Sequence, residues 1–153
     1  MLAQSPPPPS PAIMAPSPES HLSLVTGAAN PEWLHVGIDD QEGHWGYGLT
    51  IGTLVIATDV SGSLDYFLYR DGNGPYVSAE CHMIQLARVS SETPQDWNPM
   101  FSAGIGYRLH FGQTLINIGL GIPPVPIPNA YQPLVLTNAQ ALPHVLLEFG
   151  YTL

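Results

Sequence analysis

The 153-residue sequence has very few charges. It contains no lysine and only 3 arginines against 12 acidic residues, which gives a formal net charge of −9. Charged residues make up 10% of the chain, whereas soluble domains average roughly 25%. A chain with so little positive charge has no basic surface for nucleic-acid phosphates. A surface this poor in charge would also be weakly solvated, so the composition disfavours an ordinary soluble domain.

Cysteine and long hydrophobic runs are also scarce. Cys81 is the single cysteine, which excludes an internal disulfide and a multi-cysteine metal site. No stretch approaches the ~20 apolar residues of a membrane-spanning helix, and the mean hydropathy is only +0.09. The six histidines are scattered without a His-x-His pair, so we predict neither a metal site nor a cofactor. Few charges, moderate hydropathy and 15 glycines are typical of a transmembrane β-barrel, in which apolar residues alternate with small and polar ones.

Proline is concentrated at the beginning of the chain. The stretch "QSPPPPSPAIMAPSPES" cannot pair as a strand, and we interpret residues 1–20 as a disordered tail or linker. The barrel domain is then expected over residues 21–153. The opening "MLAQS" resembles the end of a secretory signal whose apolar stretch is missing, so the sequence leaves open whether Met1 is the true start or a signal peptide lies upstream.

From His21 onward, apolar residues recur at every second position. The stretch "FSAGIGYRLHF" is the clearest case, with apolar residues on one face and Ser102, Arg108 and His110 on the other. We count about eight such strands, each of a length that crosses a bilayer when tilted. The alternation predicts these lipid-facing residues: Phe101, Ile105, Tyr107, Ile116, Ile118, Leu120, Leu147, Phe149, Tyr151 and Leu153.

The predicted links between strands fall into two groups. "DDQEGH", "RDGNGP" and "FGQ" are turn-like links at one end of the strands. The links at the other end are "ANP", "DVSGS" and two long segments, residues 88–100 and 123–143. Short turns on one side and longer loops on the other side are the arrangement of outer-membrane barrels.

Alternation alone does not decide which face points outward, because a soluble lipocalin-like barrel alternates with its apolar face inside. Three features favour an apolar outer face. The second face is rich in Gly, Ser and Thr, which suits a narrow lumen. The sequence ends on an apolar strand. Aromatic residues lie near strand ends, as in interfacial girdles: Trp33, Trp45, Tyr47, Tyr76, Phe101, Phe111 and Tyr151.

The last strand, "HVLLEFGYTL", resembles the terminal signal of bacterial outer-membrane proteins. Leu147, Phe149, Tyr151 and Leu153 match its alternation, although the signal usually ends on Phe. Residues 21–153 resemble the small eight-stranded outer-membrane barrels, the OmpA-, OmpX- and opacity-like group. The resemblance implies an all-β fold, an eight-stranded antiparallel up-and-down transmembrane β-barrel. It also implies location in the bacterial outer membrane, contact with its lipid, and insertion by the barrel assembly machinery, which reads the last strand.

This resemblance supports a prediction of the architecture more strongly than a prediction of the activity. We expect a non-enzymatic protein with a structural or surface-recognition role through its extracellular loops, whose partner the sequence does not name. The alternatives are a lipid-acting enzyme of the lipid A acyl hydrolase or transferase kind, and a soluble lipocalin-like ligand-binding barrel. Ser78 and His82 share a face but lie four residues apart, about 13 Å at strand rise, so we assign no catalytic residues.

Several ionisable residues are expected to point into the lumen. They are Glu80, His82, Arg108, His110 and Glu148, and we predict that they form a polar network. An eight-stranded barrel is just wide enough for side chains to fill it, and buried charges must be paired. Arg108 is therefore predicted to bridge Glu80, Glu148 or both.

Overall fold

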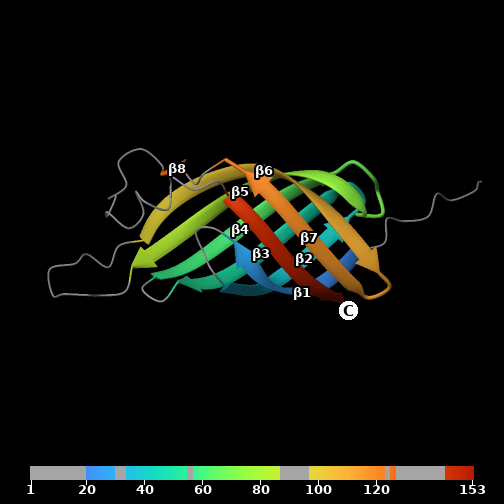
Figure 1. Cartoon of the computed structure of the whole chain (residues 1–153), viewed down its shortest axis with the longest axis horizontal. Helices are drawn as coiled ribbons and strands as arrows, with labels where there is room; N and C mark the ends of the chain where they lie inside the picture. The colour runs from blue at the N-terminus through green and yellow to red at the C-terminus, as the bar shows by residue number, and fades with distance from the viewer. Residues whose placement is uncertain (1–19, 30–33, 55–56, 87–96, 123–124, 127–143) are drawn as a thin grey trace, which may run out of the picture.

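The structure, a computed structural model, describes residues 20–29, 34–54, 57–86, 97–122, 125–126 and 144–153. These residues form a closed barrel (Figure 1). Its eight long strands are β1 (Ser20–Ala29), β2 (Leu34–Glu42), β3 (Trp45–Leu54), β4 (Ala57–Phe67), β5 (Gly74–Leu86), β6 (Trp97–Phe111), β7 (Thr114–Gly121) and β9 (His144–Thr152). The two-residue β8 (Val125–Pro126) pairs with β6.

Every pair of neighbouring long strands is antiparallel, and most neighbours are also consecutive in sequence. The order around the barrel is β5-β4-β3-β2-β1-β9-β7-β6, and β6 pairs with β5 to close the ring. The first strand meets the last one directly, with Leu24 opposite Tyr151. The predicted up-and-down barrel of eight strands is thus confirmed. Within the described ranges, no helix is long and apolar enough to span a membrane.

Three tight hairpins lie at one end of the barrel, here called the turn end. The β2–β3, β4–β5 and β6–β7 connections contain Gly43, Gly72 and Gly112, all with positive φ angles that favour glycine. The C-terminus lies at the same end (Figure 1). The other end, here called the loop end, carries the links that include the predicted long loops. Residues 1–19 of the predicted tail and most residues of those two loops fall outside the described residues, whereas Ser20, the last residue of the predicted tail, begins β1.

Some predicted links are in fact strand. Most of "DDQEGH" belongs to β2, which continues to Glu42, and all of "DVSGS" belongs to β4. β6 begins at Trp97, so it takes four residues from the predicted loop of residues 88–100. Asp, Ser and Gly favour turns, but they also suit the inward face of a narrow barrel, and the second property prevails here.

The barrel is apolar outside and polar inside. Among the described residues, 29 large hydrophobic residues are exposed, while 14 polar or charged and only 7 hydrophobic residues are buried. Nine of the ten predicted lipid-facing residues are exposed, and Ile116 is half-buried. Tyr76 is a correction: it is 5% exposed and faces the lumen, where it contacts Phe67, and is not part of an outer girdle.

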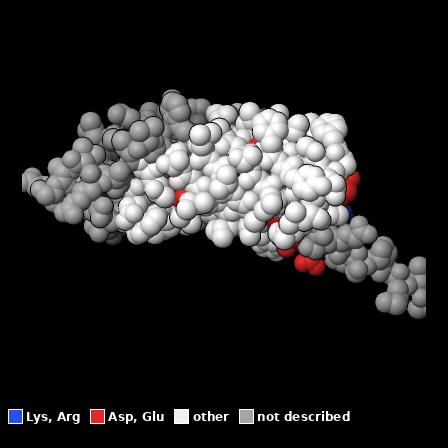
Figure 2. Space-filling model, turned by 90° about the horizontal axis from the view of Figure 1, so that it is seen from below, with Lys and Arg blue, Asp and Glu red and all other residues white. Residues whose placement is uncertain are grey.

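Charges on the outside of the described barrel gather at one end. Asp40, Glu42, Arg70 and Asp71 all lie in or beside the hairpins of the turn end. The other acidic residues of the described ranges point inward, as does Arg108. The face seen in Figure 2 is accordingly almost free of charge, with acidic atoms mainly toward the turn end. A wide uncharged band therefore surrounds the strands.

Candidate functional site: two polar clusters in the lumen

The first cluster lies in the turn-end half of the lumen, around Arg108 of β6. Its guanidinium donates two hydrogen bonds to Asp39 on β2, from Nη1 to Oδ1 at 2.8 Å and from Nη2 to Oδ2 at 2.9 Å. Arg108 Nε donates a third hydrogen bond, 2.7 Å long, to Oδ1 of Asn117 on β7. The guanidinium carbon also lies 4.5 Å from the centre of the Phe67 ring. Arg108 is 1% exposed, and this fork-to-fork pairing compensates for its desolvation.

The same cluster continues across the lumen to Glu148 of β9. Asn117 Nδ2 donates to Glu148 Oε2 at 2.8 Å, and Glu148 Oε1 lies 2.9 Å from His35 Nε2 on β2. Asp39, Arg108, Asn117, Glu148 and His35 form the turn-side cluster. It links β2, β6, β7 and β9 from the inside, so it ties strands that are not sheet neighbours.

The predicted partners of Arg108 were wrong. Arg108 pairs with Asp39, reaches Glu148 only through Asn117, and does not pair with Glu80, which belongs to a second cluster. His110 was predicted to join the network, but its ring belongs to neither cluster. Its backbone N–H instead donates to Asn73 Oδ1 in the β4–β5 hairpin, at 2.8 Å.

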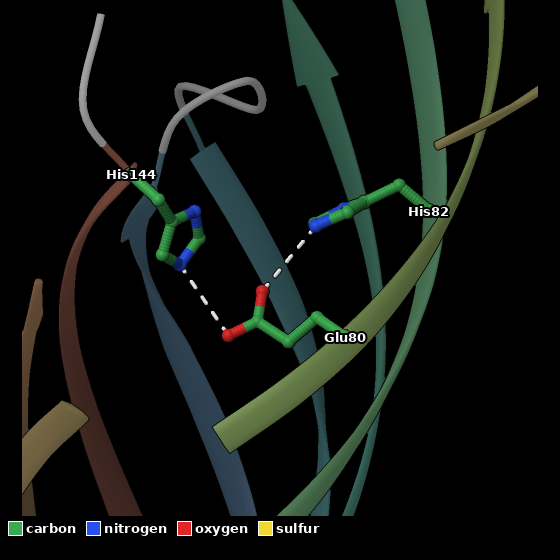
Figure 3. A group of neighbouring side chains, drawn as sticks. All are labelled: Glu80, His82 and His144. Carbon is green, nitrogen blue, oxygen red and sulfur yellow. Dashed lines mark ion pairs between the residues drawn. The ribbon is translucent and has the colours of Figure 1, made fainter. Parts of the chain in front are cut away.

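The second cluster lies in the loop-end half of the lumen, around Glu80 of β5. Glu80 Oε2 lies 3.3 Å from His82 Nε2, and Glu80 Oε1 lies 3.3 Å from Nε2 of His144 on β9. Figure 3 shows the two imidazoles approaching the carboxylate from opposite sides. The predicted association of Glu80 with His82 is present, and His144 completes the group.

Two further residues contact His82. Its Nδ1 lies 2.9 Å from Asp59 Oδ2 on β4, and its Nε2 lies 3.1 Å from the Ser102 hydroxyl on β6. Ser102 in turn donates to Glu80 Oε2 at 3.3 Å. Asp59, Glu80, His82, Ser102 and His144 form the loop-side cluster. His82 and Ser102 are fully buried, and Asp59 is 3% exposed.

Little open space remains between the two clusters. A cavity of about 30 Å³ lies among inward side chains that include Asp39, Asp65, Glu80 and Glu148. This volume holds about two water molecules. Fully buried Phe67 and Leu115 fill the turn-end half, and Ile84 packs with Met100 in the loop-end half.

The sequence interpretation missed Asp39, Asp59, Ser102 and Asn117 as members of these clusters. Their inward direction was detectable, because Asp39 continues the alternation of β2 and Asn117 that of β7. Asp59 and Ser102 likewise alternate with outward residues of β4 and β6. What was missing was the pairing across the lumen, which the barrel geometry determines.

A solved structure has a similar architecture. The crystal structure of the N-terminal β-barrel domain of Pseudomonas aeruginosa OprF superimposes with a TM-score of 0.54. The match covers 88% of this chain and 96% of that domain. The fold is that of a small outer-membrane barrel. Sequence identity is 14%, so the likeness concerns the fold. No protein-family model and no curated protein matches the sequence.

The two clusters differ in the chemistry that they could support. The turn-side cluster holds a saturated ion pair and amide bridge, which favours a structural role. In the loop-side cluster two imidazoles converge on the Glu80 carboxylate, the Ser102 hydroxyl lies beside them, and the Asp59 carboxylate contacts His82 from behind. Ser102, His82 and Asp59 even follow the order of a Ser–His–Asp triad. The loop-side cluster is therefore the candidate site for chemistry or ligand binding.

Proposed function

We propose that this protein is a bacterial outer-membrane β-barrel with a non-enzymatic role, structural or in surface recognition through its extracellular loops. The observation that carries the proposal is the uncharged outer band. Residues such as Ile105, Ile118 and Leu120 are 54–64% exposed, and the described charges outside the barrel are confined to the turn end. Exposed apolar surface of this extent is stable in contact with lipid and would associate in water.

A soluble ligand-binding barrel is less well supported. Such a barrel keeps its apolar residues inside around a ligand pocket, and pockets for small ligands measure about 300–1,000 Å³. The interior here is polar and filled, with a cavity of about 30 Å³. The same filling argues against an aqueous pore, since Arg108 and Leu115 occupy the lumen almost without exposure.

The triad-like geometry in the loop-side cluster does not favour an acyl-transfer enzyme. A serine nucleophile must give its proton to the imidazole and reach a substrate. Ser102 is fully buried, so a substrate cannot reach it, and its hydroxyl donates to Glu80. The Nε2 atom of His82 also faces the Glu80 carboxylate, so it is not available as a free base beside the serine.

The likeness to small outer-membrane barrels supports the remaining parts of the proposal. The turn end would face the periplasm, with its short hairpins, and the loop end would face outward. β9 would be the segment that the barrel assembly machinery reads, because Leu147, Phe149 and Tyr151 present an unbroken apolar face on the strand that closes the barrel.

The test is refolding with and without detergent. The protein is expected to fold only in micelles or liposomes and to migrate differently in unheated and boiled gel samples. In planar bilayers it should show no steady conductance. A monodisperse, folded protein in plain buffer would refute the membrane assignment, and hydrolysis of acylated lipid A by the folded protein would refute the non-enzymatic one.

A further inference from the structure

The loop-side cluster directs three metal-binding atoms at one point inside the barrel. They are Nε2 of His82 on β5, Nε2 of His144 on β9 and the carboxylate of Glu80 on β5 (Figure 3). These ligand atoms all lie within 4.8 Å of one another. Their side chains are 0%, 3% and 11% exposed, respectively. Three convergent ligand atoms of this kind, held on rigid strands, can form a metal-binding site.

The spacing matches that of a tetrahedral ion. Zinc binds imidazole nitrogen and carboxylate oxygen at about 2.0–2.2 Å, so adjacent ligands of a tetrahedron lie about 3.3–3.5 Å apart. Each Nε2 atom lies 3.3 Å from the nearer oxygen of Glu80. The two nitrogens contact different oxygens of Glu80, and the ligand atoms lie within 4.8 Å of one another, so the side chains must move closer together to place both nitrogens and one oxygen around a single ion.

A supporting contact is already in place behind one ligand. Asp59 Oδ2 lies 2.9 Å from His82 Nδ1, on the side of the ring away from Glu80. A carboxylate that accepts a hydrogen bond from the second ring nitrogen fixes the tautomer and orientation of metal-binding histidines. With Nδ1–H donating to Asp59, Nε2 of His82 is the ring nitrogen that would release its proton and offer its lone pair to a metal ion.

We propose that Glu80, His82 and His144 bind a divalent first-row transition metal ion, with Zn²⁺ as the best fit. Two imidazoles and one carboxylate suit such an ion better than Ca²⁺ or Mg²⁺, which take mainly oxygen ligands. Three protein ligands leave a fourth position, which a water molecule can occupy.

The proposed ion would join opposite walls of the barrel. β5 and β9 are not neighbours in the sheet: four strands separate them in one direction around the ring and two strands in the other. Binding the ion would therefore connect the two walls through the lumen and stabilise the loop-end half of the folded protein. The unfolded chain lacks this arrangement, so metal binding and stability are coupled.

The experiment uses the tag-free protein, refolded in detergent and treated with a chelator that is then removed. Calorimetric titration with ZnCl₂ should show one saturable site per chain, and CaCl₂ should show none. Co²⁺, as a spectroscopic probe, should give the visible absorption of a tetrahedral site, and Zn²⁺ should remove that signal. Zn²⁺ should also raise the unfolding temperature of the wild-type protein.

The variants separate ligands from neighbours. His82→Gln and His144→Gln should lose saturable Zn²⁺ binding, and Asp59→Asn should weaken it about 10–100-fold. Cys81→Ser is the matched control, because Cys81 lies between two ligands in sequence but is exposed on the opposite face. His110→Gln controls for an inward histidine outside the cluster. Both controls should bind Zn²⁺ like the wild type.

Three results would overturn the proposal. The first is a folded wild-type protein, judged by its unheated gel migration, that shows no saturable Zn²⁺ binding. The second is Zn²⁺ binding that survives in folded His82→Gln and His144→Gln, and the third is binding lost in Cys81→Ser. If the histidine variants fail to fold, the Co²⁺ spectra of wild type and Cys81→Ser test the ligand set instead. Imidazole and carboxylate ligands give no thiolate charge-transfer band, so such a band in the wild-type spectrum would contradict the proposed site.

Discussion

Arg108 offers the sharpest test of the lumen geometry, because the structure assigns it one ionic partner and excludes another. Its guanidinium is bidentate to Asp39 and is 1% exposed, whereas Glu80 lies in the other cluster with no shared partner. The perturbation is a set of double-mutant cycles that combine Arg108→Leu with Asp39→Leu in one case and with Glu80→Gln in the other.

The expected magnitudes follow from the contacts. Arg108→Leu removes all three hydrogen bonds of the guanidinium and leaves the Asp39 carboxylate buried without its cation. One-sided removal of a buried ion pair costs about 3–5 kcal/mol of unfolding free energy. Arg108→Leu with Asp39→Leu leaves no stranded charge, so the double variant should be more stable than the sum predicts by about 2–3 kcal/mol. The cycle with Glu80→Gln should be additive within about 0.5 kcal/mol.

The assay is reversible urea unfolding in a fixed detergent or lipid, with the slope compared among variants to check that each unfolds from the same folded state. Unheated gel migration confirms that every variant forms a barrel. Strict additivity between Arg108→Leu and Asp39→Leu would show that the pair is not formed. A coupling of Arg108 with Glu80 as large as that with Asp39 would refute the division of the lumen into two clusters.

Two further predictions test the outer and inner faces. Leu120→Arg places a charge in the uncharged band on β7 and should cost about 2–4 kcal/mol of unfolding free energy in liposomes. Thr114→Arg, at the turn end of the same strand, should cost only about 0–1 kcal/mol. Equal costs would mean that the band does not face lipid. Gly106→Ala would bring its methyl group into the Tyr76 ring, so it should destabilise the barrel by about 1–3 kcal/mol. Gly62→Ala is the control, because the nearest atom to its added methyl group would be 3.8 Å away, and it should change the urea midpoint little. A smaller loss of stability in Gly106→Ala than in Gly62→Ala would contradict the inward packing of Tyr76.

The division of residues between the two faces could be predicted from the sequence alone. The pleat of a strand turns successive side chains to opposite sides, so the period of two identifies one face of each strand. This is why Phe101, Tyr107 and Leu120 were correctly placed outside and Arg108 and Glu148 inside. The choice of an apolar exterior also followed from the polar character of the second face.

The partners inside the lumen could not be predicted in the same way. Asp39 and Arg108 are 69 residues apart and lie on β2 and β6, which are not sheet neighbours. Their contact depends on the tilt of the strands and on the stagger around the ring, neither of which leaves a local pattern in the sequence. Asp39 and Asp59 were further hidden because they lie in or beside segments whose composition is also typical of turns.

The inward glycines show how a barrel this narrow accommodates such large inward side chains. Tyr76 lies opposite Gly106 on the neighbouring strand, Leu115 opposite Gly150, and Glu148 opposite Gly27. A methyl group at any of these glycines would fall within 3.0 Å of the facing residue. Each large residue thus occupies the space that its partner leaves, and the alternation of glycine with polar residues is a packing requirement of the lumen. The same requirement explains why the ionisable groups gather in two clusters: they are placed where the facing strands leave room for their side chains.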